Sequence, residues 1–229
     1  MEKFNNHLDI HTLPLPKRIL ITFFREFFKL LYHQFAWTYD WVASIVSLGD
    51  WQNWVQSVLP YLIGPRTLEI GFGPGHLQAK LLQKGISVFG LDESPQMTRI
   101  AFRRINRLGK CQNLVRGIAQ TLPYADESFH QVVMTFPADF ILDQLTYREI
   151  HRVLVSGGEA VILPLAWITG RKPIQRAAAW LNHVTGEAPK WDEKYLEPLK
   201  MLGFNLSWKM INYSSSKILI IQLIKPSIQ

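Results

Sequence analysis

The chain has 229 residues, 48% of them hydrophobic, which suits one folded domain with a modest extension but not two full domains or a disordered chain. The formal net charge of +7 admits a nucleic acid or an anionic membrane as partner without choosing between them. No stretch approaches the ~20 apolar residues of a membrane-spanning helix, and the N-terminus lacks the pattern of a secretory signal. The single cysteine, Cys111, excludes an internal disulfide and is expected to be an inert thiol in a reducing, cytoplasmic compartment.

Residues 1–63 are predicted to form an N-terminal arm and helical cap, and residues 64–229 the main domain. An irregular polar arm over 1–16 is followed by helical patterns over 17–33, 41–48 and 51–61. The helix over 17–33 has a polar stripe too narrow for an ordinary surface helix. We expect this helix to be buried against the domain as a cap over the substrate entrance. A second subunit and an anionic membrane are the alternatives.

Strand and helix patterns alternate after residue 64. Strands are predicted over 67–71, 87–91, 113–117, 131–136 and 159–163, and helices over 76–84, 95–108 and 145–155. This order predicts right-handed crossovers and a doubly wound α/β fold, with a mainly parallel sheet and helices on both of its faces. A helix near 194–202 and strands over 204–211 and 216–224 then predict a C-terminal antiparallel hairpin.

Much of the excess positive charge lies on or just after one predicted helix. Its basic residues are Arg99, Arg103, Arg104, Arg107 and Lys110. They recur at helical spacing, and we interpret them as a solvated helix face.

The clearest chemical signal is the run Glu69-Ile70-Gly71-Phe72-Gly73-Pro74-Gly75, between a predicted strand and a helix. Its glycines allow a sharp turn and the close approach of a ligand, and the following helix offers free N–H groups to an anion. A dinucleotide-binding fingerprint would need glycine where His76 stands. The pattern instead suits an aminocarboxylate such as the methionine end of S-adenosylmethionine. A purely structural turn stays open as the alternative.

Asp92 ends the next predicted strand, about 20 residues beyond the loop, where an acidic residue can bind a ribose. A carboxylate only accepts hydrogen bonds, which suits the two donor hydroxyls of the sugar. Asp92 could also be the N-cap of the following helix. With the glycine loop in register, we favour the ribose role.

Taken together, these segments resemble the class I S-adenosylmethionine-dependent methyltransferases, in the broad group that includes the ubiquinone and menaquinone C-methyltransferases. The resemblance runs from about residue 39 to 163. It is carried by the runs 69–75, 90–97, 115–124, 128–133 and 149–154 and by the glycines at 157 and 158. It implies a seven-stranded Rossmann-like sheet, S-adenosylmethionine as cofactor, and an enzyme that methylates a small-molecule acceptor, with lipid-soluble or aromatic compounds as candidates.

The resemblance also implies roles for individual residues. Gly71, Gly73 and Gly75, preceded by Glu69, would line the methionine moiety, and Asp92 would bind the ribose. Glu93, Ser94 and Met97 would lie near the adenosine, and Ile118 and Ala119 would border the adenine. Thr135 and Phe136, with Pro137, would lie beside the sulfonium, and Tyr39 of the pair Tyr39-Asp40 would close over the cofactor. Two residues depart from the family: Ile118 stands where an aspartate is common, which predicts weaker adenine binding, and His130 replaces the aspartate of a usual Phe-Asp pair.

No residue is assigned a catalytic role. A carbon or oxygen nucleophile can need a base, but each histidine (His76, His130, His151, His183) is better interpreted as a packed or capping residue. No residue spacing suggests a metal site. The run Thr135-Phe136-Pro137-Ala138 differs from the Asn/Asp-Pro-Pro-aromatic run of enzymes that methylate amino groups, and no RNA-binding module is appended, so a nucleic acid is not the expected partner.

Residues 167–190, which contain Trp167 and Trp180 and the possible hinges Gly170 and Gly186, are predicted to form part of a substrate lid. A packed surface helix is the alternative.

Two other functions stay open: a non-catalytic S-adenosylmethionine-binding subunit or sensor, and, less favoured, an NAD-dependent oxidoreductase. The oligomeric state is left unassigned.

Overall fold

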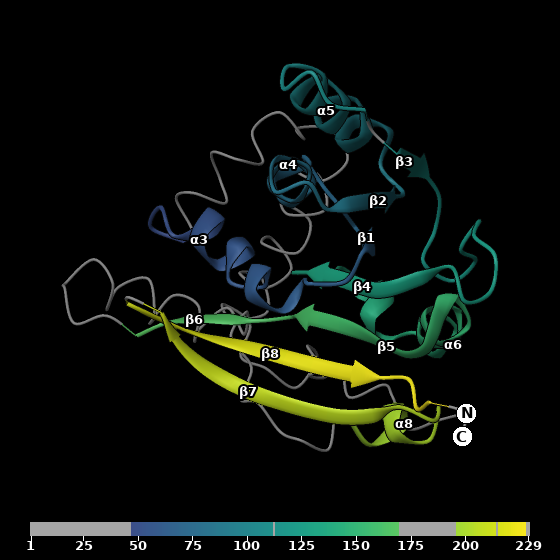
Figure 1. The fold of residues 1–229 in the computed structure, drawn as a ribbon. Helices are drawn as coiled ribbons and strands as arrows, with labels where there is room; N and C mark the ends of the chain where they lie inside the picture. Colours follow the sequence, from purple (N-terminus) through teal and green to yellow (C-terminus); the bar gives the residue numbers. More distant parts are fainter. Residues whose placement is uncertain (1–46, 112, 170–195, 214, 228–229) are drawn as a thin grey trace, which may run out of the picture.

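The computed structural model describes residues 47–111, 113–169, 196–213 and 215–227 (Figure 1). The predicted helix over 17–33, the pair Tyr39-Asp40 and most of the predicted lid lie outside the described residues. The N-terminal cap, its membrane contact and the lid beyond residue 169 therefore stay predictions. None of the helices in the described ranges combines the length and the apolar composition needed to span a bilayer.

The described chain is organised around one mixed sheet. Its strands are β1 (Arg66–Ile70), β2 (Ser87–Asp92), β3 (Asn113–Arg116), β4 (Phe129–Thr135), β5 (Leu154–Leu163), β6 (Ala166–Ile168), β7 (Asn205–Tyr213) and β8 (Ser216–Ile224). The first five lie in the order β3-β2-β1-β4-β5 and pair in parallel, and β8 pairs antiparallel with β5, β6 and β7. The predicted parallel sheet and C-terminal hairpin are confirmed.

Within the described residues the sheet has eight strands, where seven were expected. The additional strand, β6, follows β5 after a break at Pro164 and Leu165, and both pair with the same strand, β8 (Figure 1). Proline lacks the N–H that a continuous ladder needs, which explains an interruption at this point. Trp167, assigned to the lid from the sequence, lies within β6 opposite Lys217. Its assignment to the lid is wrong, because pairing with β8 fixes it in the sheet.

Helices cover both faces of the sheet, as expected for a doubly wound fold. One face packs against α6 (Gln144–Val153) and α8 (Glu197–Lys200), and the other against α3 (Trp51–Gln56) and α4 (His76–Gln83). Adjacent residues of a strand point to opposite faces of the sheet. Val132 packs in the core on the α6 face and Val133 in the second core, on the α3 and α4 face, and both are fully buried. A central strand buried on both sides reads as a continuous apolar run, which is why these strands were recognisable in the sequence.

The boundary between α6 and β5 differs from the prediction. Helix α6 ends at Val153, and β5 begins at Leu154 instead of Glu159. Leu154 pairs with Phe129 of β4, and the N–H of Gly157 donates to the carbonyl of Lys225 at 3.0 Å. These partners come from distant parts of the chain, so local sequence did not reveal them.

Residues 51–61, predicted as one helix, form α3 and a separate 3-10 turn, η3 (Leu59–Tyr61). Trp54, Val55, Val58 and Leu62 are buried in the second core beside α4 and the sheet. The Gln131 side chain of β4 holds the connection to β1: its Nε2 donates to the carbonyl of Tyr61, and its Oε1 accepts from the N–H of Gly64, both at 2.6 Å. The end of the predicted cap is thus anchored on the domain.

Candidate cofactor-binding site

A pocket lies at the carboxyl ends of β1 and β4. It is lined by Glu69, Gly71 and Gly73 from β1 and the following loop, by Thr135 from β4, and by Trp51 and Val55 from α3; Phe72, Pro74, His76 and Leu77 complete it. Strand order reverses between β1 and β4, because β2 and β3 lie on one side and β5 on the other. Such a switch point, where neighbouring crossovers leave in opposite directions, is where open α/β sheets bind their ligands.

The loop between β1 and α4 has a left-handed backbone at each of its glycines. The φ angles are +74° at Gly71, +51° at Gly73 and +78° at Gly75. A Cβ atom at Gly73 would meet no atom within 4 Å, whereas one at Gly75 would lie 2.7 Å from the Cβ of Ala101. Gly73 therefore leaves open space beside the backbone, and Gly75 lets α5 (Pro95–Asn106) approach closely.

The N–H groups of the three glycines in this loop already have partners within the chain. That of Gly71 donates to the carbonyl of Leu91 at 2.7 Å, and that of Gly75 to the carbonyl of Phe72 at 3.0 Å. Gly73 donates to Asp92 Oδ2 at 2.8 Å, and Pro74 has no N–H. The loop therefore presents little of the N–H cluster that cradles a pyrophosphate.

Arg104 of α5 was interpreted as part of a solvated helix face, and that interpretation is wrong for this residue. Its guanidinium donates a hydrogen bond to the carbonyl of Pro74, within the glycine loop. The sequence did not predict this contact, because Arg104 stands at helical spacing among exposed arginines. Only the packing of α5 beside the loop brings the guanidinium and the carbonyl together.

Asp92 joins the glycine loop to the start of α5. Its Oδ2 accepts from Gly73 and its Oδ1 accepts from the N–H of Ser94 at 2.8 Å. Burial raises the pKa of the carboxyl, partly offset by these two backbone hydrogen bonds. The N-cap of α5 is Ser94, whose hydroxyl accepts from Met97 N–H, so the alternative role of Asp92 as N-cap does not apply. Each carboxylate oxygen retains a lone pair for a further donor.

Glu69, at the floor of the pocket, is a buried carboxyl. It is 1% exposed, and this burial raises the pKa of its carboxyl to about 8, although a hydrogen bond with the Gln78 side chain lowers it. Its Oε2 has no hydrogen-bond partner among the described residues. A buried acceptor without a partner is costly, and it fits a ligand that brings a donor or a positive charge.

Aromatic rings stand at the end of β4. Phe136 has a left-handed φ of +46°, unusual for a residue with a side chain, and its ring stacks on Trp51 of α3 with centroids 4.3 Å apart. Thr135, one residue earlier, lines the pocket. The strained backbone of Phe136 and its stacking partner give the carboxyl end of β4 an apolar wall.

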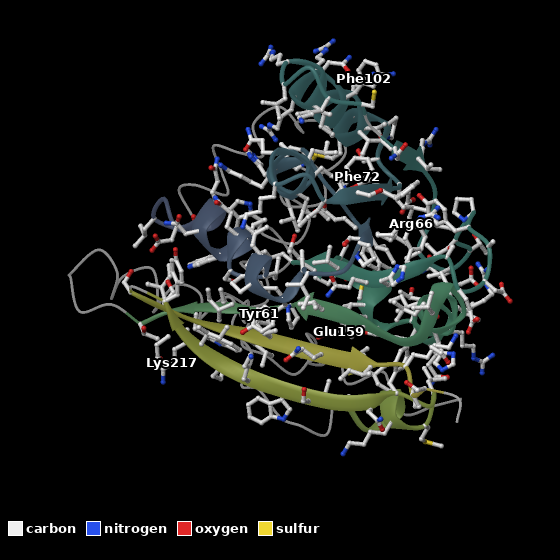
Figure 2. All side chains as sticks on the ribbon, in the orientation of Figure 1. Tyr61, Arg66, Phe72, Phe102, Glu159 and Lys217 are labelled. Carbon is white, nitrogen blue, oxygen red and sulfur yellow. The ribbon has the colours of Figure 1, made fainter. Side chains whose placement is uncertain are left out.

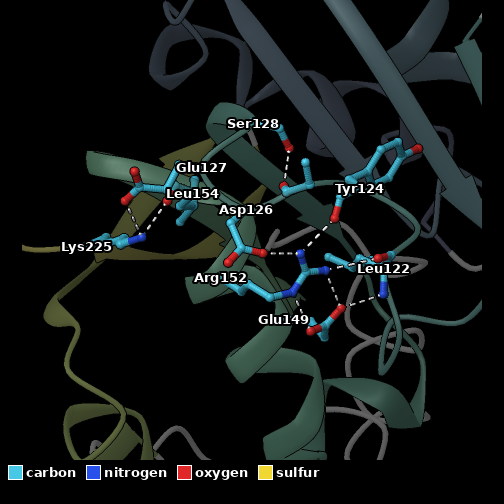
Figure 3. A network of polar contacts seen from close by, with 10 residues as sticks. Leu122, Tyr124, Asp126, Glu127, Ser128, Glu149, Arg152, Leu154 and Lys225 are labelled. Atoms are coloured by element: carbon cyan, nitrogen blue, oxygen red, sulfur yellow. Dashed lines mark hydrogen bonds and ion pairs between the residues drawn. The ribbon is translucent and has the colours of Figure 1, made fainter.

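The loop over 117–128, which follows β3, is held by Arg152 of α6 (Figure 3). The guanidinium forms two hydrogen bonds with Glu149, at 2.8 and 2.7 Å, and one with Asp126 at 2.8 Å. It also donates to the carbonyls of Tyr124 and Leu122, at 2.7 and 3.0 Å. Glu149 in turn accepts from the N–H of Leu122 at 2.7 Å, and the hydrogen bonds from Arg152 hold the pKa of Glu149 below its usual value.

The remaining predicted site residues lie on this loop and around the start of α5. Ile118 is 44% exposed, and Ala119 is buried in the core at 4%. Glu93 is exposed beside Ser94, and Met97 is 2% exposed on the inner side of α5. The structure thus gathers the β1 loop, Asp92 and the end of β4 around the switch point, while the assigned ligand contacts of these residues stay predictions.

Among the described histidines, only His76 lines the pocket, at the first residue of α4. His130 is at the amino end of β4, opposite the pocket, and His151 packs edge-on against Phe204 with a pKa lowered by burial. His183 lies outside the described residues. No cluster of metal-ligating side chains occurs in the part of the chain that the structure describes.

Comparisons with known proteins agree with this geometry. A family model described as a methyltransferase domain matches residues 68–162. The demethylmenaquinone methyltransferase of Chlorobaculum parvum is 30% identical over 156 residues, covering 64% of this chain and 63% of that protein. The ubiquinone/menaquinone biosynthesis C-methyltransferase of Geotalea uraniireducens is 27% identical over 134 residues, covering 55% and 57%. The chain thus spans less than two thirds of the length of these relatives.

A solved structure shares the fold. Phosphoethanolamine N-methyltransferase 2 of Haemonchus contortus, in complex with phosphomonomethylethanolamine and S-adenosylhomocysteine, aligns with a TM-score of 0.59 at 17% identity. The alignment covers 78% of this chain and 53% of that protein. Residues 68–162 thus form a methyltransferase domain, and the chain resembles the class I S-adenosylmethionine-dependent methyltransferases of the ubiquinone and menaquinone group.

Proposed function

We propose that the chain is a methyltransferase that uses S-adenosylmethionine and methylates a small, apolar acceptor of the quinone kind. The main support for this cofactor is the chemistry of the glycine loop and of the carboxyl groups of Glu69 and Asp92. The N–H groups of Gly71, Gly73 and Gly75 are bonded within the chain, while Glu69 and Asp92 supply carboxyl oxygens. Such a site favours a cationic ligand over the pyrophosphate of a dinucleotide. This supports S-adenosylmethionine over NAD.

The residues at the switch point fit the parts of this cofactor. The buried Oε2 of Glu69, which lacks a partner among the described residues, would accept from the ammonium group, whose positive charge favours the ionised carboxylate. Open space at Gly73 admits the ligand beside the backbone. The remaining lone pairs of Asp92 would accept from the ribose hydroxyls, and Ile118 and Ala119 would border the adenine.

S-adenosylmethionine supplies a methyl group on a sulfonium that leaves as a neutral thioether, so the protein need only position the acceptor and keep the site dry. Trp51 and Phe136 form an aromatic wall that excludes water and offers a flat face to a ring. The pocket side chains Val55, Phe72 and Leu77 are also apolar. This wall and the names of the two relatives support a quinone-type acceptor.

Two measurements test the proposal in sequence. Calorimetry should show binding of S-adenosylmethionine and S-adenosylhomocysteine but not of NAD, and Asp92→Ala should weaken it. Methyl-labelled cofactor should then transfer label to a quinol in organic extracts, and not to phosphoethanolamine. Cofactor binding without transfer to any acceptor would favour a non-catalytic binding protein, whereas transfer to the amine alone would keep the enzyme and remove the quinone class.

A further inference from the structure

The positive charge of the chain is concentrated on one helix and the turn after it. Residues 95–111 contain five Lys and Arg residues and no Asp or Glu, which leaves 20 basic and 18 acidic residues in the rest of the chain. Five of the seven net charges therefore lie within 17 residues. The charge is a property of α5 and its C-terminal turn, not of the molecule as a whole.

The packing of α5 fixes where these charges point. Its buried side is formed by Met97, Ala101 and Ile105, which are at most 2% exposed. Arg99 and Arg103 lie on its exposed side, and Arg107 and Lys110 are exposed at its C-cap and in the turn that follows. None of the four forms an ion pair with another described residue. Like charges four residues apart on a helix repel one another, and a partner outside the chain would relieve that repulsion.

Apolar side chains stand beside the charges. Phe102 is 47% exposed and Leu108 is 37% exposed. In Figure 2, Phe102 lies at the outer end of the molecule, on the same helix as several nitrogen-tipped side chains. A rigid helix with basic residues on its exposed side and apolar residues among them has the composition that binds the interface of an anionic membrane. A nucleic acid would engage the same charges, but it gives no reason for the exposed aliphatic Leu108.

We propose that the exposed side of α5 and the turn after it, formed by Arg99, Phe102, Arg103, Arg107, Leu108 and Lys110, docks on an anionic membrane surface. The guanidinium groups would pair with headgroup phosphates and carboxylates, and Phe102 and Leu108 would enter the boundary of the acyl chains. Arg104 has a different role, because it holds the glycine loop. The inference depends on the charge and packing of α5 and stands apart from the choice of cofactor or acceptor.

Flotation of the full chain with vesicles tests this surface. Vesicles of phosphatidylglycerol and phosphatidylcholine are compared with phosphatidylcholine alone, for the wild type and for Arg99→Gln/Arg103→Gln/Arg107→Gln. The matched control, Arg148→Gln/Lys209→Gln/Lys217→Gln, removes the same charge from exposed residues on α6, β7 and β8. Phe102→Ser tests the apolar contribution. Unchanged cofactor affinity and thermal midpoint show that each variant is folded.

The wild type should float with the anionic vesicles only, and release at about 1 M salt, where the Debye length is about 3 Å. The α5 triple variant should bind roughly 100-fold more weakly, since each basic residue near an anionic surface contributes a factor of about five. The control triple should bind like the wild type, and Phe102→Ser about fivefold more weakly.

Equal loss of vesicle binding in both triple variants, or no wild-type flotation, would overturn the proposal. So would binding of single-stranded RNA in place of vesicles, which would identify the surface as a nucleic-acid site. Wild-type binding by the α5 variant would move the membrane contact elsewhere, as to residues 17–33.

Discussion

Two loops border the candidate site, and they are held in place by different means. The glycine loop over 71–75 depends on its own backbone: three left-handed glycines, and hydrogen bonds to the neighbouring strand end at Leu91 and Asp92. The loop over 117–128 has one such backbone contact, from Gly117 N–H to the carbonyl of Asp92, and the Arg152 and Glu149 side chains of α6 bind the rest of it from outside. A ligand bound between them would therefore contact one surface set by backbone conformation and another set by side-chain ionic contacts.

The largest expected effect tests the backbone-determined loop. Gly75→Ala should lower the free energy of unfolding by about 2–4 kcal/mol, because it combines a strained φ with a Cβ placed 2.7 Å from Ala101. Gly85 has the same φ of +78° but open space around it, so Gly85→Ala should cost only about 1–2 kcal/mol. Urea denaturation measures both, and equal losses would mean that the contact with α5 is unimportant.

The loop held from outside should respond to a change on α6. Arg152→Ala should destabilise the protein by about 1–3 kcal/mol, since it leaves Glu149 and two loop carbonyls without their donor at a partly exposed site. Hydrogen exchange should accelerate over 118–127 and stay unchanged over 71–75. Arg152→Lys should not restore protection, because an ammonium cannot reproduce the forked geometry. The exposed Arg148→Ala is the control, and an equal effect there would contradict the assignment.

A change at Asp92 affects the contact between the glycine loop and the strand beside it. Asp92→Ala should weaken S-adenosylmethionine binding by about 1–3 kcal/mol, because ribose hydroxyls and the N–H groups of Gly73 and Ser94 lose their acceptor. Asp92→Asn keeps one acceptor oxygen and should lie between Ala and the wild type. Calorimetry that gives the wild-type affinity for Asp92→Ala would remove this residue from the site.

A further expected difference concerns the pH dependence of stability beneath the glycine loop. Glu69 has a folded pKa of about 8 and an ordinary value of 4.5, so the folded state binds the extra proton between these values. The contribution of Glu69 to stability is complete below 4.5 and is lost as the pH rises through about 8. Glu69→Gln has no proton to lose and should remove this part of the slope. Urea midpoints compared from about pH 5 to about pH 9 measure it, and identical slopes would show that Glu69 is ionised in the folded protein.

The predictable part of the site lies where a few consecutive residues carry both the conformation and the chemistry. The run from Glu69 to Gly75 predicts a turn, and Asp92 follows it at the spacing set by one helix and one strand. The structure confirms the strand, the helix and the proximity of Asp92 to Gly73. The buried strands were equally recognisable in the sequence, because a strand with apolar residues on both faces appears as a short continuous apolar run.

Other contacts depended on chain segments that meet only in the folded molecule. Arg104 looked like its solvated neighbours, and only the approach of α5 to the loop gives it Pro74 as a partner. The Gln131 side chain forms hydrogen bonds with the backbone of Tyr61 and Gly64, which lie about 70 residues away in the chain. β6 is a strand because it pairs with β8, and its three residues are too few to show a strand pattern in the sequence.

The sequence by itself determined the alternation of strands and helices, the left-handed turns of the glycine loop and the acid at the end of β2, because each depends on local backbone preferences and regular spacing. Only the tertiary structure decided that Glu69 is buried with a raised pKa, that Phe136 stacks on Trp51 and that Arg152 fastens the loop over 117–128. The physical reason is the same in each case: burial, ring stacking and ion pairing depend on which groups come within a few ångströms, and sequence separation does not encode that distance.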